Sequence, residues 1–292
     1  STYIDALKEA IDAILQITGA SDLNMLGACS GGITTAALLG HLQATGEKKV
    51  NAFTQLVSVL DFTLDSQVAL FADEQTLEAA KRRSYQAGVL EGKDMAKVFA
   101  WMRPNDLIWN YWVNNYLLGN EPPVFDILYW NNDTTRLPAA FHGELVEMFK
   151  TNPLLRANAL EVCGTPIDLK QVTCDFFCVA GTTDHITPWE ACYRSALLLG
   201  GKCEFVLSNS GHIQSILNPP GNPKARYMTN SELPADPQAW LASCSKHADS
   251  WWLHWQSWVQ ERSGKLKKTN FNLGSKAFPP AEASPGTYVH ER

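Results

Sequence analysis

The sequence of 292 residues contains no run approaching the ~20 consecutive apolar residues that a membrane-spanning helix needs, and no secretory signal is visible. It has seven cysteines, an odd number, and none of them forms a C-x-x-C pair. We therefore expect no disulfide framework, no metal site and a cytoplasmic location. The basic residues are scattered through a chain of net charge −6, which argues against a nucleic-acid-binding surface.

The first third of the sequence contains strand-like and helical segments in alternation. A short apolar strand over residues 23–26 is separated from a helix over residues 33–42 by the glycine-rich hexapeptide of residues 27–32. The next strand, residues 53–60, is apolar throughout, as buried parallel strands are, and it ends at Asp61. Strand, turn, helix and strand form a βαβ unit, which predicts a parallel sheet.

The pattern changes after Asp61 and becomes helical and aromatic, with no convincing strand before about residue 158. Strands alternate with helices again from Asp175, and the proline-rich residues 219–237 read as a loop. We therefore predict an α/β fold of the α/β-hydrolase type, with a mostly parallel sheet and an inserted helical cap. Residues 1–61 and 164–292 form the predicted catalytic core, and residues 62–163 form the predicted cap.

Gly27, Cys29 and Gly31 have the spacing of a nucleophile elbow, with cysteine where most such elbows carry serine. The nucleophile of an elbow lies on a tight strand-to-helix turn with strained dihedral angles, so we expect the residues two before and two after it to be small. A helix N-terminus favours the thiolate form of a cysteine, and the backbone N–H of Ser30 is the predicted oxyanion donor. The alternative is that Cys29 is a small buried apolar residue.

An elbow predicts an acid and then a base, each after a later strand. Asp184 directly follows one apolar strand, and His212 follows the next. We predict that His212 takes the thiol proton and that Asp184 orients the imidazole. Asp61 also ends a strand and is an alternative acid; His185 is an alternative base, although its position next to Asp184 requires awkward geometry. A thiol nucleophile suits exchange between thioesters, which favours acyl transfer over hydrolysis.

Several segments together resemble the polyhydroxyalkanoate synthases, and the resemblance runs over nearly the whole chain. The elbow sequence resembles the class II enzymes, which favour medium-chain monomers. The segments that carry the resemblance are Gly27-Ala28-Cys29-Ser30-Gly31-Gly32, Leu60-Asp61-Phe62, Asp184-His185-Ile186-x-Pro188-Trp189, Ser210-Gly211-His212-Ile213 and Trp251-Trp252-Leu253-His254-Trp255.

This resemblance implies polymerisation of (R)-3-hydroxyacyl-CoA into polyester with release of coenzyme A, which is part of the substrate and not a cofactor. Cys29 would hold the growing chain and His212 would be the base, while Asp184 would either support His212 or activate the 3-hydroxyl of the monomer. The family also implies a homodimer, a mobile cap and attachment to cytoplasmic polymer granules. Because the family has further strands before the elbow, we expect N-terminal strands to be missing here and the chain alone to have little activity.

Two other functions stay open at this point. One is a cysteine hydrolase of the same fold, either dienelactone-hydrolase-like or a polyester depolymerase; such enzymes usually lack so large a cap or carry serine at the elbow. The other is a catalytically silent scaffold that binds granules. The presence of Cys29, Asp184 and His212 together argues against the silent scaffold.

Overall fold

The computed structural model describes residues 1–63, 73–122, 124, 130, 133–269 and 272–290. The chain divides into two compact units, the first formed by Ser1–Asp61 and Pro153–Arg292 and the second by Phe62–Asn152. Residues 153–163, which the sequence pattern placed in the cap, belong to the first unit. The reason is a hairpin of β5 (Leu160–Val162) and β6 (Thr165–Ile167), whose Val162 carbonyl lies 3.1 Å from His41 Nδ1 in α2 (Ser30–Thr45).

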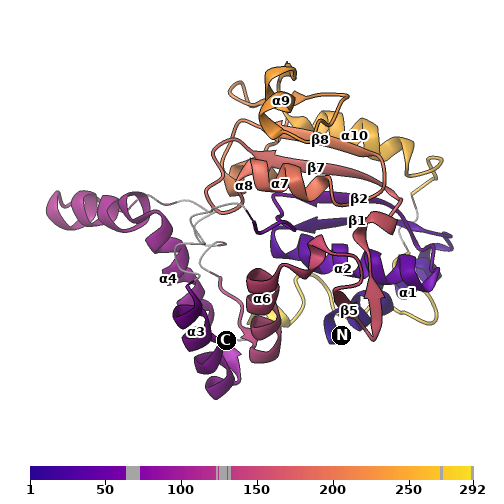
Figure 1. The fold of residues 1–292 in the computed structure, drawn as a ribbon, viewed down its shortest axis with the longest axis horizontal. Helices are drawn as coiled ribbons and strands as arrows, with labels where there is room; N and C mark the ends of the chain where they lie inside the picture. The colour runs from indigo at the N-terminus through magenta and orange to yellow at the C-terminus, as the bar shows by residue number, and fades with distance from the viewer. Residues whose placement is uncertain (64–72, 123, 125–129, 131–132, 270–271, 291–292) are drawn as a thin grey trace. The chain divides into compact units, whose positions relative to one another are not determined.

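The first unit is built on a six-stranded sheet with the order β1-β2-β7-β8-β9-β10 among the described residues (Figure 1). Its first four strands are parallel neighbours, as the sequence predicts. They are β1 (Leu23–Ala28), β2 (Val50–Leu56), β7 (Asp175–Gly181) and β8 (Cys203–Ser208). The second strand ends at Leu56 and not at Leu60 because Val57 turns the backbone to φ 42°.

Two further strands form an antiparallel extension that the sequence pattern did not predict. They are β9 (Arg226–Thr229) and β10 (Ser245–Ala248). The interpretation of residues 219–237 as loop was therefore wrong for the four residues of β9. Three of them pair with β8, from Val206↔Thr229 to Ser208↔Tyr227. Both strands are short and lack buried side chains, so they carry no apolar signature that a sequence pattern could reveal.

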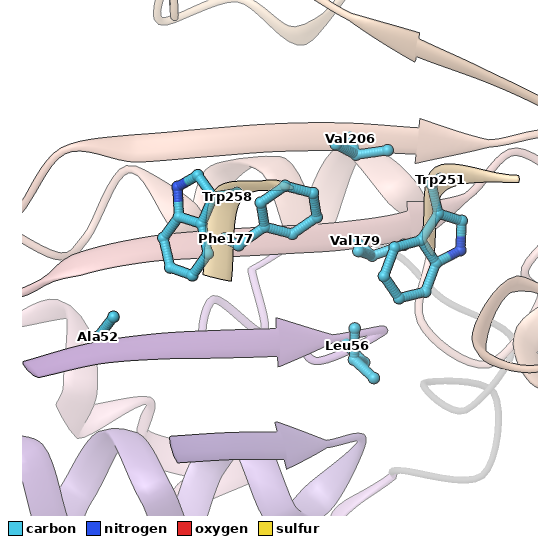
Figure 2. Packing of buried hydrophobic residues seen from close by; sticks show 7 residues of the cluster. All are labelled: Ala52, Leu56, Phe177, Val179, Val206, Trp251 and Trp258. Carbon is cyan, nitrogen blue, oxygen red and sulfur yellow. The ribbon is translucent and has the colours of Figure 1, made fainter. Parts of the chain in front are cut away.

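One face of the sheet is covered by α10 (Trp251–Glu261), the tryptophan-rich helix (Figure 2). A row of paired residues on β2, β7 and β8, namely Leu56, Val179 and Val206, contributes to this core. Phe177 lies next to the row on β7, and the ring centroid of Trp258 lies 5.4 Å from it. Burial of these large aromatic rings adds to the apolar stabilisation of this core.

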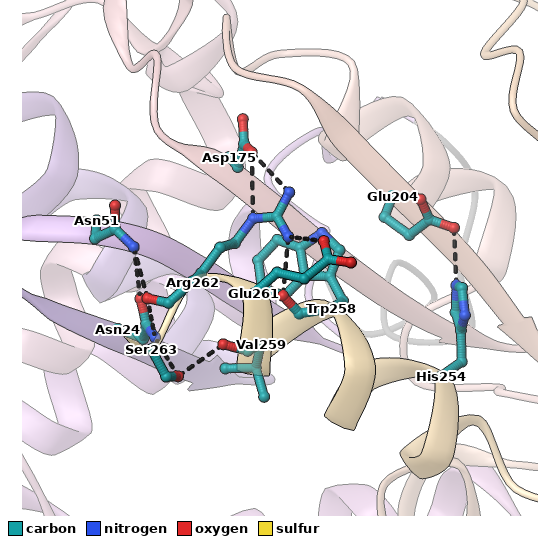
Figure 3. Close-up of polar contacts among 10 residues, drawn as sticks. All are labelled: Asn24, Asn51, Asp175, Glu204, His254, Trp258, Val259, Glu261, Arg262 and Ser263. Carbon is teal, nitrogen blue, oxygen red and sulfur yellow. Dashed lines mark hydrogen bonds and ion pairs between the residues drawn. The ribbon is translucent and has the colours of Figure 1, made fainter. Parts of the chain in front are cut away.

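The C-terminal end of α10 is bonded to the starts of three strands (Figure 3). The guanidinium of Arg262 donates to Asp175 at the start of β7 over 2.8 Å and lies 4.2 Å from the Trp258 ring centroid. Its backbone carbonyl accepts hydrogen bonds from the side chains of Asn24 in β1 and Asn51 in β2. The helix is thus held against the sheet by the hydrogen bonds of Arg262 as well as by its apolar face.

The remaining α-helices in the described part of the first unit are α1 (Thr2–Thr18), α7 (Trp189–Ala196), α8 (His212–Ile216) and α9 (Pro237–Ala242). Of these, α8 follows β8 and begins at His212. None of the helices in the described part of the chain combines the length and the hydropathy of a membrane span.

The described part of the second unit is mostly helical. Its elements are α3 (Glu74–Ala87), α4 (Gly92–Met102), the π-helical segments η2 (Asn105–Trp109) and η3 (Trp112–Leu117), α6 (Ala139–Thr151), and a ladder of β3 (Val89–Leu90) with β4 (Leu137–Pro138). Ser84 Oγ and His142 Nδ1 lie 2.9 Å apart between α3 and α6. The two-residue ladder is too short to leave a strand pattern in the sequence.

Candidate active site

Cys29 lies at the junction of β1 and α2, with φ 51° and ψ −124°. This backbone conformation is uncommon for a residue with a side chain and is held only where its surroundings impose it. The surroundings here are the end of β2: the Cys29 N–H donates to the Leu56 carbonyl over 2.9 Å, and the Cys29 carbonyl accepts from Ser58 Oγ over 2.7 Å. Both backbone polar groups of the strained residue are therefore bonded.

The glycines around Cys29 differ in how much room they have. A Cβ on Gly27 would overlap the hydroxyl of Thr35, and a Cβ on Gly32 would overlap the side chain of Ser58. A Cβ on Gly31 would meet nothing within 4 Å. The expectation that Gly31 must be small was therefore wrong, and Gly32 is the position after the cysteine where the turn has no space.

Replacing Gly32 with alanine is expected to lower the free energy of unfolding by about 2 kcal/mol, as in other overpacked sites. The new methyl group would push Ser58 away from the Cys29 carbonyl. Gly31→Ala is the matched control, and it should raise stability by up to about 1 kcal/mol because alanine favours helices. Urea unfolding followed by circular dichroism measures both, and equal stabilities of the two variants would contradict this packing argument.

Asp184 and His212 are brought together from the ends of β7 and β8. Asp184 Oδ2 lies 2.7 Å from His212 Nδ1, and both residues are buried. The other carboxylate oxygen, Oδ1, accepts hydrogen bonds from the backbone N–H groups of Ile186 and Thr187, each over 2.9 Å. Thr187 Oγ1 also donates to Oδ2 over 2.7 Å. Four donors therefore surround one carboxylate.

The electrostatics of this pair favour a charged acid and a strongly basic imidazole. Burial by itself raises the pKa of Asp184, but the bonds from His212 and Thr187 outweigh it and lower that pKa. Burial by itself lowers the pKa of His212, but the interactions with Asp184 and then Cys29 raise that pKa to about 9. A strongly basic imidazole is a good proton acceptor, which makes His212 the candidate base for the Cys29 thiol.

The other predicted residues have the following places. Ser30 is the first residue of α2, so its backbone N–H has no acceptor within the helix. Asp61, the alternative acid, is buried, and its backbone N–H donates to Ser195 Oγ over 3.1 Å. The carboxylate bonded to His212 Nδ1 is that of Asp184. His185 is half-buried beside Asp184.

Two supporting residues were missed by the sequence patterns. Ser58 bonds to the carbonyl of Cys29, and Thr187 bonds to the carboxylate of Asp184 through both its N–H and its hydroxyl. Thr187 follows Asp184 by three residues, a spacing typical of turns in which a carboxylate accepts from nearby N–H groups. That spacing could have identified Thr187 from the sequence, whereas no sequence pattern marks Ser58.

Cys29 differs from the cysteines that are buried. Burial holds the pKa values of Cys178 and Cys192 well above the usual range. Those thiols stay protonated and inert, whereas Cys29 is half-exposed. In the described part of the chain, no group of three or more His, Cys, Asp or Glu residues is arranged to hold a metal ion.

A family model described as alpha/beta hydrolase fold matches residues 1–219. The chain belongs to the α/β-hydrolase fold family. This α/β-hydrolase chain is 77% identical over its whole length to poly(3-hydroxyalkanoate) polymerase 1 of Ectopseudomonas oleovorans and 61% identical to polymerase 2 of that organism. It is 38% identical, over 98% of its length, to the poly(3-hydroxyalkanoate) polymerase subunit PhaC of Cupriavidus necator.

The chain covers 52%, 52% and 50% of these three relatives, about half of each. The predicted α/β class with a mostly parallel sheet is confirmed by the family match and by the strand order. The resemblance to the polyhydroxyalkanoate synthases is confirmed by the relatives' names and identities.

Proposed function

We propose that this chain carries the catalytic machinery of an acyltransferase that polymerises (R)-3-hydroxyacyl-CoA into polyhydroxyalkanoate and releases coenzyme A. The observation that carries the proposal is the elbow cysteine with its Asp184–His212 pair, in a chain 77% identical to a poly(3-hydroxyalkanoate) polymerase over its whole length. A thioester substrate and a thiol nucleophile match, because exchange between two thioesters keeps the acyl group activated.

In the first half-reaction, His212 takes the thiol proton of Cys29 and the sulfur attacks the thioester carbonyl of the substrate. The backbone N–H of Ser30 at the start of α2 donates to the oxyanion that forms. The bond between the carbonyl carbon and the coenzyme A sulfur then breaks. His212 returns the proton to the departing thiolate, which leaves the acyl group on Cys29.

In the second half-reaction, the 3-hydroxyl of another hydroxyacyl group attacks the thioester on Cys29. His212 takes the hydroxyl proton, an ester bond forms, and the Cys29 thiolate leaves and is reprotonated. The same imidazole serves both steps, so its orientation affects acylation and chain growth alike.

Asp184 acts through His212 in this mechanism and does not bind the 3-hydroxyl. An ionised carboxylate offers about four acceptor sites. In Asp184 these sites face the N–H groups of Ile186 and Thr187, the Thr187 hydroxyl and His212 Nδ1. A substrate hydroxyl would have to displace one of these bonds, in a buried place where an unsatisfied donor is costly.

The finer features follow from the resemblance. The class II likeness of the elbow supports medium-chain monomers, and the family supports a homodimer on the surface of cytoplasmic polyester granules. The second unit, as the proposed cap, exposes large aromatic side chains that suit an apolar product. Those more than half exposed among the described tryptophans and tyrosines of residues 100–130 are Trp101, Tyr116 and Trp130.

The test is to incubate the complete protein with (R)-3-hydroxyacyl-CoA and to separate polymer from free acid. We expect polymer together with stoichiometric release of coenzyme A. Release of coenzyme A with an equal amount of free 3-hydroxy acid would instead identify a cysteine hydrolase. An absence of coenzyme A release would favour a silent granule-binding scaffold.

A further inference from the structure

The tryptophan block at the start of α10 is bonded to the short helix that carries His212. Trp251 Nε1 donates to the Ser215 carbonyl over 2.7 Å, and Trp252 Nε1 donates to the Ile216 carbonyl over 3.0 Å. The hydroxyl of Ser250, which also caps α10, donates to the carbonyl of Asn218. The first two side chains of α10 and the residue that caps it thus donate to the end of α8 and to the turn that follows it.

These bonds matter because α8 has only five residues. The last four carbonyl groups of any helix have no partner within it. The backbone N–H groups just past α8 bond the carbonyls of Ile213 and Ile216, whereas the Ser215 carbonyl accepts from Trp251. The helix begins at His212, and both Ser215 and His212 are buried. The side chains of Trp251 and Trp252 therefore stabilise the whole element on which the imidazole sits.

The donors themselves are held firmly against the sheet. Trp251 is 3% exposed, and its ring centroid lies 6.2 Å from that of Phe177. Both side chains are drawn in Figure 2. Further along α10, Trp255 Nε1 donates to Thr54 Oγ1 on β2 over 2.9 Å. Arg262 bonds the other end of the helix to the start of β7 (Figure 3). The end of β2 also accepts a hydrogen bond from the Cys29 N–H, so α10, which holds α8, and the elbow are both bonded to the same strand.

We propose that Trp251 and Trp252 are positioning residues for the general base: their indole N–H groups fix α8 and so hold His212 against Cys29. The inference rests on the proposed function for its catalytic meaning. Only tryptophan combines a large apolar ring that packs on the sheet with an N–H at its far edge.

The test compares Trp251→Phe with Trp258→Phe in the complete protein. Both variants lose an indole from α10 that packs on Phe177, but Trp258 lies about two turns further along the helix, away from α8. The first readout is the rate of Cys29 alkylation by iodoacetamide against pH, located by peptide mass. It requires no substrate, so it stands even if the proposed function is wrong. The second readout is kcat and KM for polymer formation.

We expect Trp251→Phe to slow alkylation at neutral pH and to lower kcat, each about tenfold, with KM unchanged, because small displacements of a catalytic group are costly. Trp258→Phe should keep both rates within about twofold while losing comparable stability. Identical alkylation profiles of the two variants would overturn the proposal.

If Trp251→Phe does not fold, Trp252→Phe replaces it. Its ring is only half-buried, so the variant loses the bond to the Ile216 carbonyl with less packing. A fall of about threefold in alkylation rate is expected, because the second bond from Trp251 remains. An unchanged rate would count against the positioning role.

Discussion

Replacing Cys29 with alanine is expected to abolish polymer formation and coenzyme A release, with a loss of about 10⁴-fold or more. The variant has no nucleophile, while the imidazole and the helix N-terminus remain. Alanine fits the turn as cysteine does, because the backbone bonds to Leu56 and Ser58 do not involve the sulfur. Coenzyme A release measured with a thiol reagent and intact mass after incubation with acyl-CoA check the result.

Cys244→Ala is the matched control, since this cysteine is also half-buried in the first unit, and it should leave activity unchanged. Cys29→Ser adds information because the acyl group would then be held as an oxygen ester. That ester is less activated than a thioester, so the acyl-enzyme should accumulate in the mass spectrum. More than a tenth of the activity remaining in Cys29→Ala would point to another nucleophile and contradict the proposed function.

The parallel part of the fold and the places of the candidate site residues at its strand ends were predictable from sequence, because both depend on local patterns. A buried parallel strand is an apolar run, and the elbow between β1 and α2 has a spacing imposed by sterics. Asp184 and His212 lie in the turns that follow β7 and β8, in the order that the elbow predicts. Chemistry-bearing residues at strand ends are therefore visible to a reader of the sequence.

What could not be predicted depends on tertiary pairing. The strands β9 and β10 have no buried side chains. The pairing of β9 with β8, and of β10 with β9, is decided by backbone hydrogen bonds that any residue type can make. The role of Ser58 depends on the strained backbone of Val57, which returns the chain toward the elbow. The bonds from α10 to α8 join residues 36 positions apart, so no local pattern contains them.

The three polar arrangements at the site have a common logic. The strained backbone of Cys29 is bonded by Leu56 and Ser58, the carboxylate of Asp184 is saturated by donors, and the helix of His212 is capped from α10. Each removes freedom from a group that must meet the other two. A catalytic constellation that is fixed before substrate arrives does not have to spend substrate binding energy on ordering itself.

Asp184→Asn is expected to lower acylation of Cys29 and elongation of the polymer by the same factor, about 10³-fold or more. The carboxylate accepts four hydrogen bonds, whereas an asparagine has an NH₂ donor in place of one of its oxygens. This NH₂ group must face either the backbone N–H groups or His212 Nδ1. The imidazole then loses its orientation and the partner that raises its pKa. Since the same imidazole serves both half-reactions, both should suffer equally.

The measurement separates the two half-reactions by choice of substrate. A saturated acyl-CoA, which lacks the 3-hydroxyl, reports acylation of Cys29 alone by rapid quench and intact mass, whereas (R)-3-hydroxyacyl-CoA reports chain growth. Asp168→Asn makes the same chemical change at a carboxylate that only caps a short helical turn, and it should leave both rates unchanged. If Asp184→Asn kept normal acylation and lost only elongation, the carboxylate would have to act on the monomer hydroxyl, contrary to its four bonds within the chain.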